Sequence, residues 1–258
     1  MATCCASAAD SFGFATWNVG HFALGLRRKS TIDAKDAPEK AVEYRKFLSS
    51  AAVSVLGVCE HSAAFTSDGS LKAADTAFAE FGACALGPTQ GAHGNGVYWK
   101  NGIKLIASGH RDYPVRNAPC YYEWVRLEIA GREVCFVETH CDWNTQEPGH
   151  EFDRAEQMKC LVRTFESEPR IVIAGDFNTC QRKTAKDKWR DAPEEFEIFR
   201  QAGFKAAHWG TCKTWPASSP WQTIDNVFVK GLEISDVRVR TDKVLSDHGL
   251  LRCTLTFK

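Results

Sequence analysis

The sequence predicts an α+β sandwich in which two mixed β-sheets pack face to face and helices cover their outer faces. Three observations support this fold. Strand-like runs outnumber helical segments by nine to four, a Gly-containing turn joins two of the runs, and helical segments separate several of the others. A doubly wound parallel sheet needs a helix after nearly every strand, so it fits this pattern less well.

The strand-like runs are short, apolar and rich in β-branched or aromatic residues. In chain order they cover residues 12–17, 53–58, 96–99, 103–108, 122–129, 133–139, 171–175, 223–229 and 248–257. The segment IAGRE, at 129–133, lies between the fifth and sixth runs and contains a glycine. A connection of this length predicts a hairpin, so the two runs are expected to pair as antiparallel neighbours.

Helical periodicity of apolar residues marks the remaining elements. It covers residues 39–52, 71–82, 152–166 and 193–202. The last segment has the clearest boundaries, because Pro193 suits a first helical position and Gly203 suits a helix end. No Pro/Gly/Ser-rich linker or low-complexity tract divides the chain, so we expect a single domain over residues 1–258.

The composition is that of an ordinary globular protein, with 44% hydrophobic and 25% charged residues. Because 32 basic residues balance 32 acidic ones, the overall charge indicates neither a nucleic-acid nor a membrane partner. Eleven Cys, an odd number without CxxC spacing, predict reduced thiols rather than disulfides or a zinc site. The pattern of a signal peptide is missing and no apolar run could span a membrane, so we expect a monomeric cytoplasmic protein without integral membrane association.

Four strand-like runs end on side chains that ligate metals or transfer protons. They lead into Asn18, into Glu60, into His140, and into Asp176 with Asn178. Each residue alone is most simply a turn former, a helix cap or a structural histidine. The set is harder to explain by turn chemistry. If the strand ends meet at one edge of the sheets, these side chains line a single cleft.

The types of side chain indicate the chemistry of this cleft. Carboxylates and carboxamides are hard oxygen donors, which suit magnesium, with manganese and calcium as alternatives. Glu60 and Asp247 would supply the one or two carboxylates that magnesium usually takes from a protein. Asp225 can orient His248, since a carboxylate bonded to one ring nitrogen fixes the tautomer. A metal, two histidines, an acid and an amide are the parts needed for attack of water on phosphorus.

Eight short motifs follow one another along nearly the whole chain. They are TWNVG (16–20), Glu60, HGNGVYW (93–99), ETHCDW (138–143), DRAEQ (153–157), AGDFN (174–178), TIDNVFV (223–229) and LSDHG (245–249). This series resembles the motifs of the endonuclease/exonuclease/phosphatase superfamily, the deoxyribonuclease I-like hydrolases. The combination of GDFN, an ID-containing strand and SDH is its specific part. The resemblance implies a four-layer sandwich, with helices outside two mixed sheets.

The resemblance also implies a metal site. Glu60 would be the principal ligand, assisted by Asn18 and Asp247 directly or through water. Gln usually precedes this Glu in the family, whereas Cys59 precedes it here. The departure changes a neighbour of the proposed ligand and removes none of the ligands.

For the reaction itself, the resemblance implies that His140 and His248 contact the non-bridging oxygens of the scissile phosphate. Asp225 would pair with His248. Asp176 and Asn178 would orient the attacking water and help to take its proton, and the identity of the general base stays open. Strand alternation places both on one side of the strand.

The substrate is less well defined, because the superfamily cleaves nucleic acids, phospholipids and protein–nucleic acid linkages on one fold. The candidate substrate contacts are Asn95, Trp143, Arg182 and Lys183. The basic stretch 182–190 could attract a polyanion or form a solvated helix face. We expect a phosphodiesterase or nuclease whose substrate is a phosphoester, with nucleic acid as the candidate class. The alternatives are a phosphomonoesterase, a phospholipid or sphingomyelin-type phosphodiesterase and, in another class, a catalytically inactive phosphate-binding module.

Overall fold

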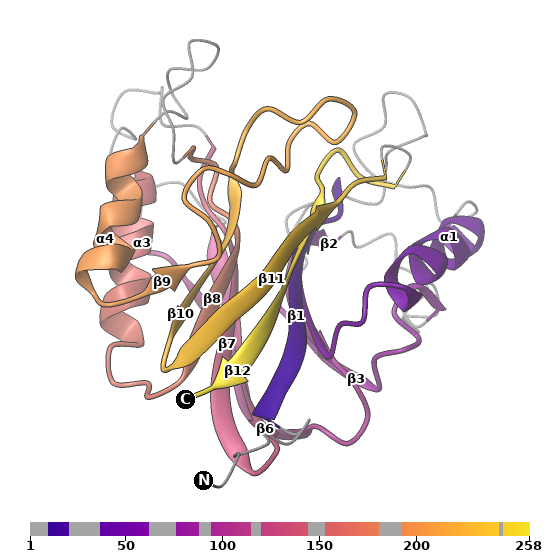
Figure 1. Cartoon of the computed structure of the whole chain (residues 1–258), viewed down its shortest axis with the longest axis horizontal. Helices are drawn as coiled ribbons and strands as arrows, with labels where there is room; N and C mark the ends of the chain where they lie inside the picture. The colour runs from indigo at the N-terminus through magenta and orange to yellow at the C-terminus, as the bar shows by residue number, and fades with distance from the viewer. Residues whose placement is uncertain are drawn as a thin grey trace, which may run out of the picture.

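Two mixed β-sheets form the centre of the molecule (Figure 1). The computed structural model describes residues 10–20, 37–61, 76–87, 94–114, 120–143, 153–180, 192–242 and 245–258. Within these residues each sheet has six strands, and each contains one parallel pair among antiparallel ones. The predicted pair of mixed sheets is therefore confirmed.

The first sheet has the strand order β11-β12-β1-β2-β4-β3. Its strands are β1 (Ser11–Asn18), β2 (Val55–His61), β3 (Ala83–Leu86), β4 (Gly94–Trp99), β11 (Leu232–Arg240) and β12 (Leu250–Phe257). The parallel pair is β1 with β2, in which Asn18 lies opposite Cys59. The ends of these two strands therefore lie side by side.

The second sheet has the order β5-β6-β7-β8-β10-β9. Its strands are β5 (Lys104–Asp112), β6 (Tyr121–Ile129), β7 (Arg132–His140), β8 (Ile171–Asp176), β9 (Lys205–Ala206) and β10 (Asp225–Lys230). The hairpin predicted at IAGRE joins β6 to β7, and Ala130 and Gly131 at its tip have φ values of 50° and 73°. Two consecutive positive φ angles suit the right-handed twist of a two-residue hairpin, so this prediction is confirmed.

Helices lie on the two outer faces, as Figure 1 shows. They are α1 (Ala37–Ser49), α3 (Asp153–Thr164), the short 3₁₀ turn η4 (Pro193–Phe196) and α4 (Glu197–Gln201). Tyr44 and Leu48 of α1 pack with Trp17 on the outer face of the first sheet. Met158 of α3 and Phe199 of α4 pack with residues of the second sheet. A third apolar cluster fills the space between the sheets, which gives four layers.

The structure corrects several element boundaries. Three strands, β3, β9 and β11, were not predicted. The sequence of β11, LEISDVRVR, is rich in charged residues because all but one of its side chains are exposed or partly exposed at the edge of the sheet. The last predicted helix divides into η4 and α4 at Glu197. Of the helix predicted over 71–82, residues 71–75 lie outside the described part of the chain, and residues 76–82 hold a short helical turn before β3.

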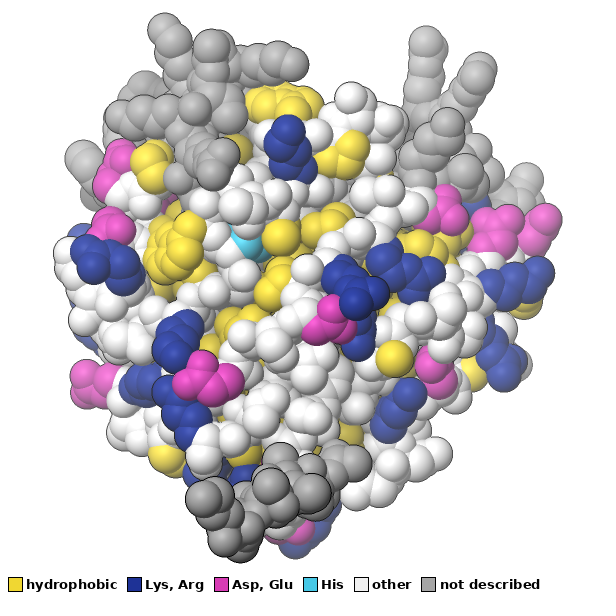
Figure 2. Space-filling model, viewed as in Figure 1, with side chains coloured by type: hydrophobic (Ala, Val, Ile, Leu, Met, Phe, Trp, Pro, Cys, Tyr) yellow, Lys and Arg dark blue, Asp and Glu magenta, His cyan; other side chains and the backbone are white. Residues whose placement is uncertain are grey.

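Three features of the described residues bear on what the composition predicts: the state of the cysteines, the distribution of charge and the character of the helices. The cysteines in the described ranges are free thiols, most of them buried. On the face shown in Figure 2, Lys and Arg side chains are intermixed with Asp and Glu. None of the helices in the described residues combines the length and apolarity needed to cross a membrane.

A buried carboxyl group, Glu138 of β7, interrupts the apolar layer between the sheets. Its side chain is 1% exposed, and its Oε1 accepts hydrogen bonds from Thr16 Oγ1 at 2.6 Å and Cys59 Sγ at 3.2 Å. Its Oε2 has no partner among the described residues, and a Cβ atom on Gly57 would approach it to 1.8 Å. Gly57 therefore makes the room for this carboxyl group. Burial raises the pKa of Glu138 to about 8, and likewise that of Glu123, its register partner on β6.

The Glu138→Gln variant is expected to change how stability depends on pH. Between the ordinary value of 4.5 and the folded value of about 8, the folded protein keeps a proton that the unfolded chain releases. The contribution of Glu138 to the free energy of unfolding is therefore full below pH 4.5 and is lost as pH rises through about 8. Gln cannot ionise, so we expect the variant to gain stability over the wild type between about pH 5 and about pH 8, by up to about 1.4 kcal/mol per pH unit.

Urea unfolding of the wild type and of Glu138→Gln, at about pH 5 and at about pH 8, measures this difference. The exposed Glu133 on the same strand is the matched control, because its replacement by Gln should leave the pH dependence of the wild type unchanged. An advantage of Glu138→Gln that does not grow with pH would contradict the assignment of a buried, protonated carboxyl group.

Candidate active site

The ends of β7, β8 and β10 bring three predicted site residues together. His140 lies opposite Asp176 in the parallel pair β7–β8, and Asp225 lies opposite Asp176 in the antiparallel pair β10–β8. The apolar residues of these three strands fill the interior, so each polar side chain is carried on a rigid strand. The expected meeting of His140 and Asp176 at one sheet edge is therefore found, with Asp225 beside them.

Asp176 is the centre of the contacts. It is 2% exposed, its Oδ2 accepts a hydrogen bond from Asn18 Nδ2 at 3.0 Å, and its Oδ1 accepts one from the backbone N–H of Asn178 at 2.8 Å. The Nε2 atoms of His140 and His248 each lie 3.7 Å from Asp176 Oδ2. Residues from both sheets therefore converge on one carboxylate.

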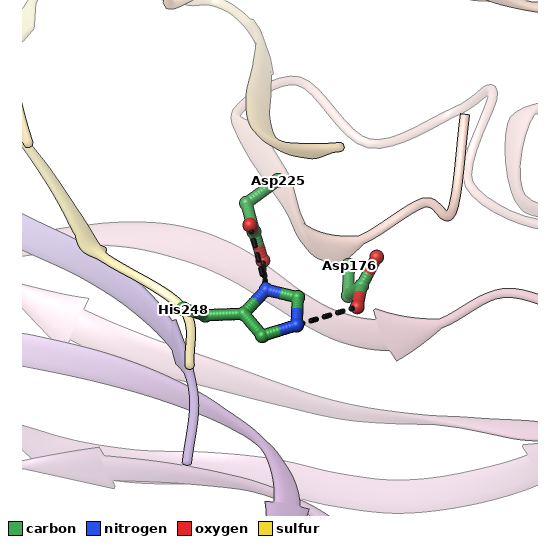
Figure 3. Close-up of side chains that lie close together, drawn as sticks. All are labelled: Asp176, Asp225 and His248. Carbon is green, nitrogen blue, oxygen red and sulfur yellow. Dashed lines mark hydrogen bonds and ion pairs between the residues drawn. The ribbon is translucent and has the colours of Figure 1, made fainter. Parts of the chain in front are cut away.

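His248 lies between two carboxylates, as Figure 3 shows. Its Nδ1 lies 3.0 Å from Asp225 Oδ2 and 3.3 Å from Oδ1, while its Nε2 points toward Asp176. Burial alone would lower the pKa of the imidazole, but the charge and hydrogen bond of Asp225, together with Asp176 and Asp247, raise it to about 10. His248 is therefore an imidazolium at neutral pH, with Nε2–H directed into the site.

His140 is held by Asn178, which follows β8. The Nδ2 atom of Asn178 donates to the carbonyl oxygen of Cys141 at 2.9 Å and lies 2.9 Å from His140 Nε2. Because a carbonyl only accepts, the nitrogen of the amide must face Cys141, and the same nitrogen then donates to His140 Nε2. In this arrangement His140 Nε2 is an acceptor, unlike His248 Nε2. The neighbouring Phe177 points into the outer apolar cluster, opposite to the site.

Asn18 and Glu60 bring the first sheet into the site. Asn18 Nδ2 lies between Glu60 Oε1, at 3.1 Å, and Asp176 Oδ2, at 3.0 Å, whereas Asn18 Oδ1 accepts from the backbone N–H of Gly20 at 2.9 Å. The amide nitrogen thus faces the two carboxylates and holds them together. Glu60 Oε1 also lies 3.8 Å from His140 Nε2, and its backbone has a φ of 54°, in the left-handed region.

The loop before β12 contributes Ser246 and Asp247 beside His248. Ser246 Oγ donates to the carbonyl of Asn18 at 2.6 Å and accepts from the N–H of His248 at 3.0 Å, which ties this loop to β1. Asp247 is partly exposed, and its Oδ2 accepts from Trp215 Nε1 at 3.1 Å. The ring of Trp215 also lies 6.5 Å from that of His248. The sequence predicted Asp247 as a site residue, but the hydrogen bond from Trp215 to it was not predicted.

The described residues fit a bound cation. Ligand atoms of Asp176, Asp225 and His248 lie within 4.8 Å of one another, and all three side chains are buried. Hard carboxylate oxygens suit magnesium, manganese or calcium. The single imidazolium balances only one of the two buried carboxylates, so this cluster retains negative charge that a cation would compensate.

The four predicted substrate contacts differ in their positions: one is exposed near the site, one is buried between the sheets, and two lie outside the described residues. Trp143 follows β7 and is 56% exposed, close in sequence to His140. Asn95, in contrast, is 2% exposed and its Nδ2 donates to the carbonyl of Tyr121 at 2.8 Å, so it links the two sheets. Arg182 and Lys183, with the rest of the basic stretch, lie outside the described residues.

Comparisons with known proteins bear on the family and on the fold. The sequence profile of the Endonuclease/Exonuclease/phosphatase family matches residues 15–248. No curated protein matches the sequence. Among solved structures, an endonuclease/exonuclease/phosphatase from Beutenbergia cavernae has a TM-score of 0.73 at 17% identity, covering 96% of this chain and 72% of that one.

Two further structures align with this chain over nearly the full length of both proteins. An endonuclease/exonuclease/phosphatase from Bacteroides vulgatus has a TM-score of 0.70 at 16% identity, over 96% of this chain and 99% of that one. The catalytic domain of human Nocturnin, solved with a bound sulfate anion, has a TM-score of 0.69 at 17% identity, over 96% and 95%. At these identities the structural similarity establishes the shared fold.

Proposed function

Since the chain belongs to the endonuclease/exonuclease/phosphatase family, we propose that it is a metal-dependent phosphodiesterase that directs water at a phosphorus centre. The observation that carries this proposal is the convergence of Asn18, His140 and His248 on the buried carboxylate of Asp176. The Asp176 carboxylate supplies a proton acceptor, and the His248 imidazolium supplies a positive hydrogen-bond donor for a phosphate.

In the proposed reaction Asp176 orients the attacking water and accepts its proton. The backbone N–H and side chain of Asn178 hold Asp176 and His140, so Asn178 keeps the acceptor aligned. His248 donates its Nε2–H to a non-bridging phosphate oxygen, because its Nδ1 is already used by Asp225. The positive charge on His248 is then available where negative charge develops in the transition state.

Magnesium is the proposed metal, and manganese and calcium are the alternatives to test. When bound, it would neutralise charge on the phosphate oxygens and help to generate the nucleophile. Glu60 and Asp247 are the proposed carboxylate ligands, with Asn18 assisting. Because Asn18 turns its nitrogen toward Glu60, its proposed contribution is to hold the carboxylates in place. Asp176 and Asp225 offer further carboxylate oxygens within the same cluster, whereas His248, with both ring nitrogens protonated, would contact the phosphate and not the metal.

A nucleic acid is the proposed substrate class. Trp143 is the most exposed large apolar side chain in the described residues, at 56%, and lies just beyond β7. Trp215 and Trp221 pack edge to face at 6.2 Å next to Asp247. Indoles that are exposed, as in Trp143, or partly exposed, as in Trp215 and Trp221, suit stacking on nucleobases beside a phosphate site. Arg182 and Lys183 are proposed to hold the backbone of the same substrate, whereas Asn95 belongs to the scaffold between the sheets.

Hydrolysis assays with the purified protein test the proposal. We expect release of p-nitrophenol from bis-p-nitrophenyl phosphate and cleavage of labelled DNA or RNA in magnesium, and loss of both in EDTA with recovery on added magnesium. A monoester, p-nitrophenyl phosphate, and sphingomyelin vesicles are compared under identical conditions. Faster turnover of either would assign the site to the monoesterase or lipid class, and turnover of none of these substrates would overturn the proposed function.

A further inference from the structure

The start of α3 contains two polar side chains that are almost completely buried and that the proposed reaction does not use. Arg154 is 1% exposed and Gln157 is 0% exposed. The guanidinium of Arg154 forms a two-point pair with Glu195 of η4, with Nε 2.9 Å from Oε2 and Nη2 3.3 Å from Oε1. A fully buried, fork-like pair of this kind fixes the direction of the guanidinium.

The third arm of Arg154 reaches the active site. Its Nη1 donates to the carbonyl oxygen of Asn178 at 2.6 Å. Asn178 has a φ of 51°, in the left-handed region that side chains other than glycine rarely adopt. Asn is among the residues that tolerate this conformation, and Arg154 adds a charged hydrogen bond to it from the helix side.

Gln157 holds the neighbouring loop in the same way. Its Oε1 accepts from the backbone N–H of Asp142 at 2.9 Å. Asp142 directly follows Cys141, whose carbonyl accepts from Asn178 Nδ2 at 2.9 Å. One turn of helix thus contacts the segment after β7 through Gln157 and the segment after β8 through Arg154, and these are the two segments that carry the contact between Asn178 and His140.

We propose that the first turn of α3 is a clamp in which Arg154 and Gln157 are positioning residues for His140 and Asn178. Arg154 acts through the carbonyl of Asn178, and Gln157 acts through the backbone of Asp142. Neither side chain touches the reacting atoms. The clamp sets the acceptor direction of His140 Nε2 and the placement of the Asp176–Asn178 turn, and its consequence for catalysis rests on the phosphodiesterase function proposed above.

The competing explanation is that Arg154 and Glu195 form a structural ion pair without influence on the site. Two variants separate the explanations because one keeps the bond from Arg154 to the carbonyl of Asn178 and the other removes it. Glu195→Gln weakens the charge pairing but leaves the bond from Arg154 to Asn178. The double variant Arg154→Met/Glu195→Leu removes that bond together with both charges, and it fills the space with apolar side chains that buried ion pairs often tolerate.

We expect the double variant to fold but to lose about 10- to 100-fold in kcat with KM near the wild-type value. Glu195→Gln is the matched control and should unfold at lower temperature while keeping kcat within about threefold of the wild type. Wild-type kcat in the folded double variant would overturn the clamp. If that variant does not fold, Arg154→Lys keeps a positive charge beside Glu195 but lacks the fork, and wild-type kcat in this variant has the same meaning.

A second readout does not need turnover. The ¹⁵N chemical shift of His140 Nε2 reports the hydrogen bond from Asn178, and we expect it to change in the double variant and to persist in Glu195→Gln. An unchanged shift in the double variant would also overturn the clamp. If the wild type hydrolyses no phosphoester, the proposed function fails, but the ¹⁵N shifts still decide whether Arg154 positions the His140–Asn178 pair.

Discussion

The Asp176→Asn variant is expected to lower kcat by about 1,000-fold or more. The substitution preserves the shape of the side chain but removes the charge and the proton acceptor. It also disturbs the local bonding, because Asp176 accepts from both Asn18 Nδ2 and the N–H of Asn178, and an amide has only one acceptor atom. Steady-state hydrolysis of bis-p-nitrophenyl phosphate in magnesium measures the effect, which should be in kcat more than in KM.

Asp236 is a matched control, because it is an acid of the same type that lies outside the active site. Asp236 lies on the surface and pairs with Arg238 at 2.7 Å and Arg252 at 2.8 Å. Its replacement by Asn should leave kcat unchanged, since exposed pairs contribute little even to stability. Turnover by Asp176→Asn within about tenfold of the wild type would show that another group accepts the proton of the water.

The main parts of the fold could be predicted because they depend on local pattern. The apolar runs of β7 and β8 are continuous and end on polar residues, so both their type and their functional ends were visible in the sequence. The hairpin between β6 and β7 was visible for the same reason, since its turn chemistry lies within five residues. Edge strands such as β11 were not visible, because an exposed, charged strand is defined by its pairing with β12.

The contacts within the site depend on information that is not local. The pairing of Asp225 with Asp176 follows from the register of two strands that are far apart in the chain. The orientation of the Asn18 amide follows from the backbone N–H of Gly20. This N–H donates a hydrogen bond to the amide oxygen, so the amide nitrogen faces Glu60 and Asp176. Residue type therefore predicted which side chains meet, whereas only the structure shows which atom each one presents.

Arg154 illustrates the same limit from the other side. The sequence identified DRAEQ as a motif but gave no reason for its basic residue, which lies at the start of an amphipathic helix where an exposed Arg would be ordinary. Its burial depends on Glu195, which comes from a separate short turn. A buried charge becomes visible as a functional candidate only when its partners are known, because burial is costly unless the charge is paired.

The Asp225–His248 pair leads to the second large effect. We expect His248→Gln to lower kcat by about 1,000-fold, since it removes the positive donor to the phosphate. Asp225→Asn should lower kcat by about 100-fold or more, because the carboxylate orients the imidazole and supports its charge. If Asp225 acts only through His248, the double variant should have the same kcat as His248→Gln alone.

The four proteins should rank differently by free energy of unfolding than by kcat. This difference separates the structural contribution of the pair from its catalytic one. Asp225 is 1% exposed, so His248→Gln leaves a buried carboxylate without its charged partner and should lower the free energy of unfolding by about 3–5 kcal/mol. Asp225→Asn in the same chain removes that charge, so the double variant should regain stability without regaining activity. Urea unfolding and steady-state kinetics of all four proteins measure both orders. A double variant whose loss in kcat equals the product of the two single losses would instead mean that Asp225 acts on the substrate independently of His248.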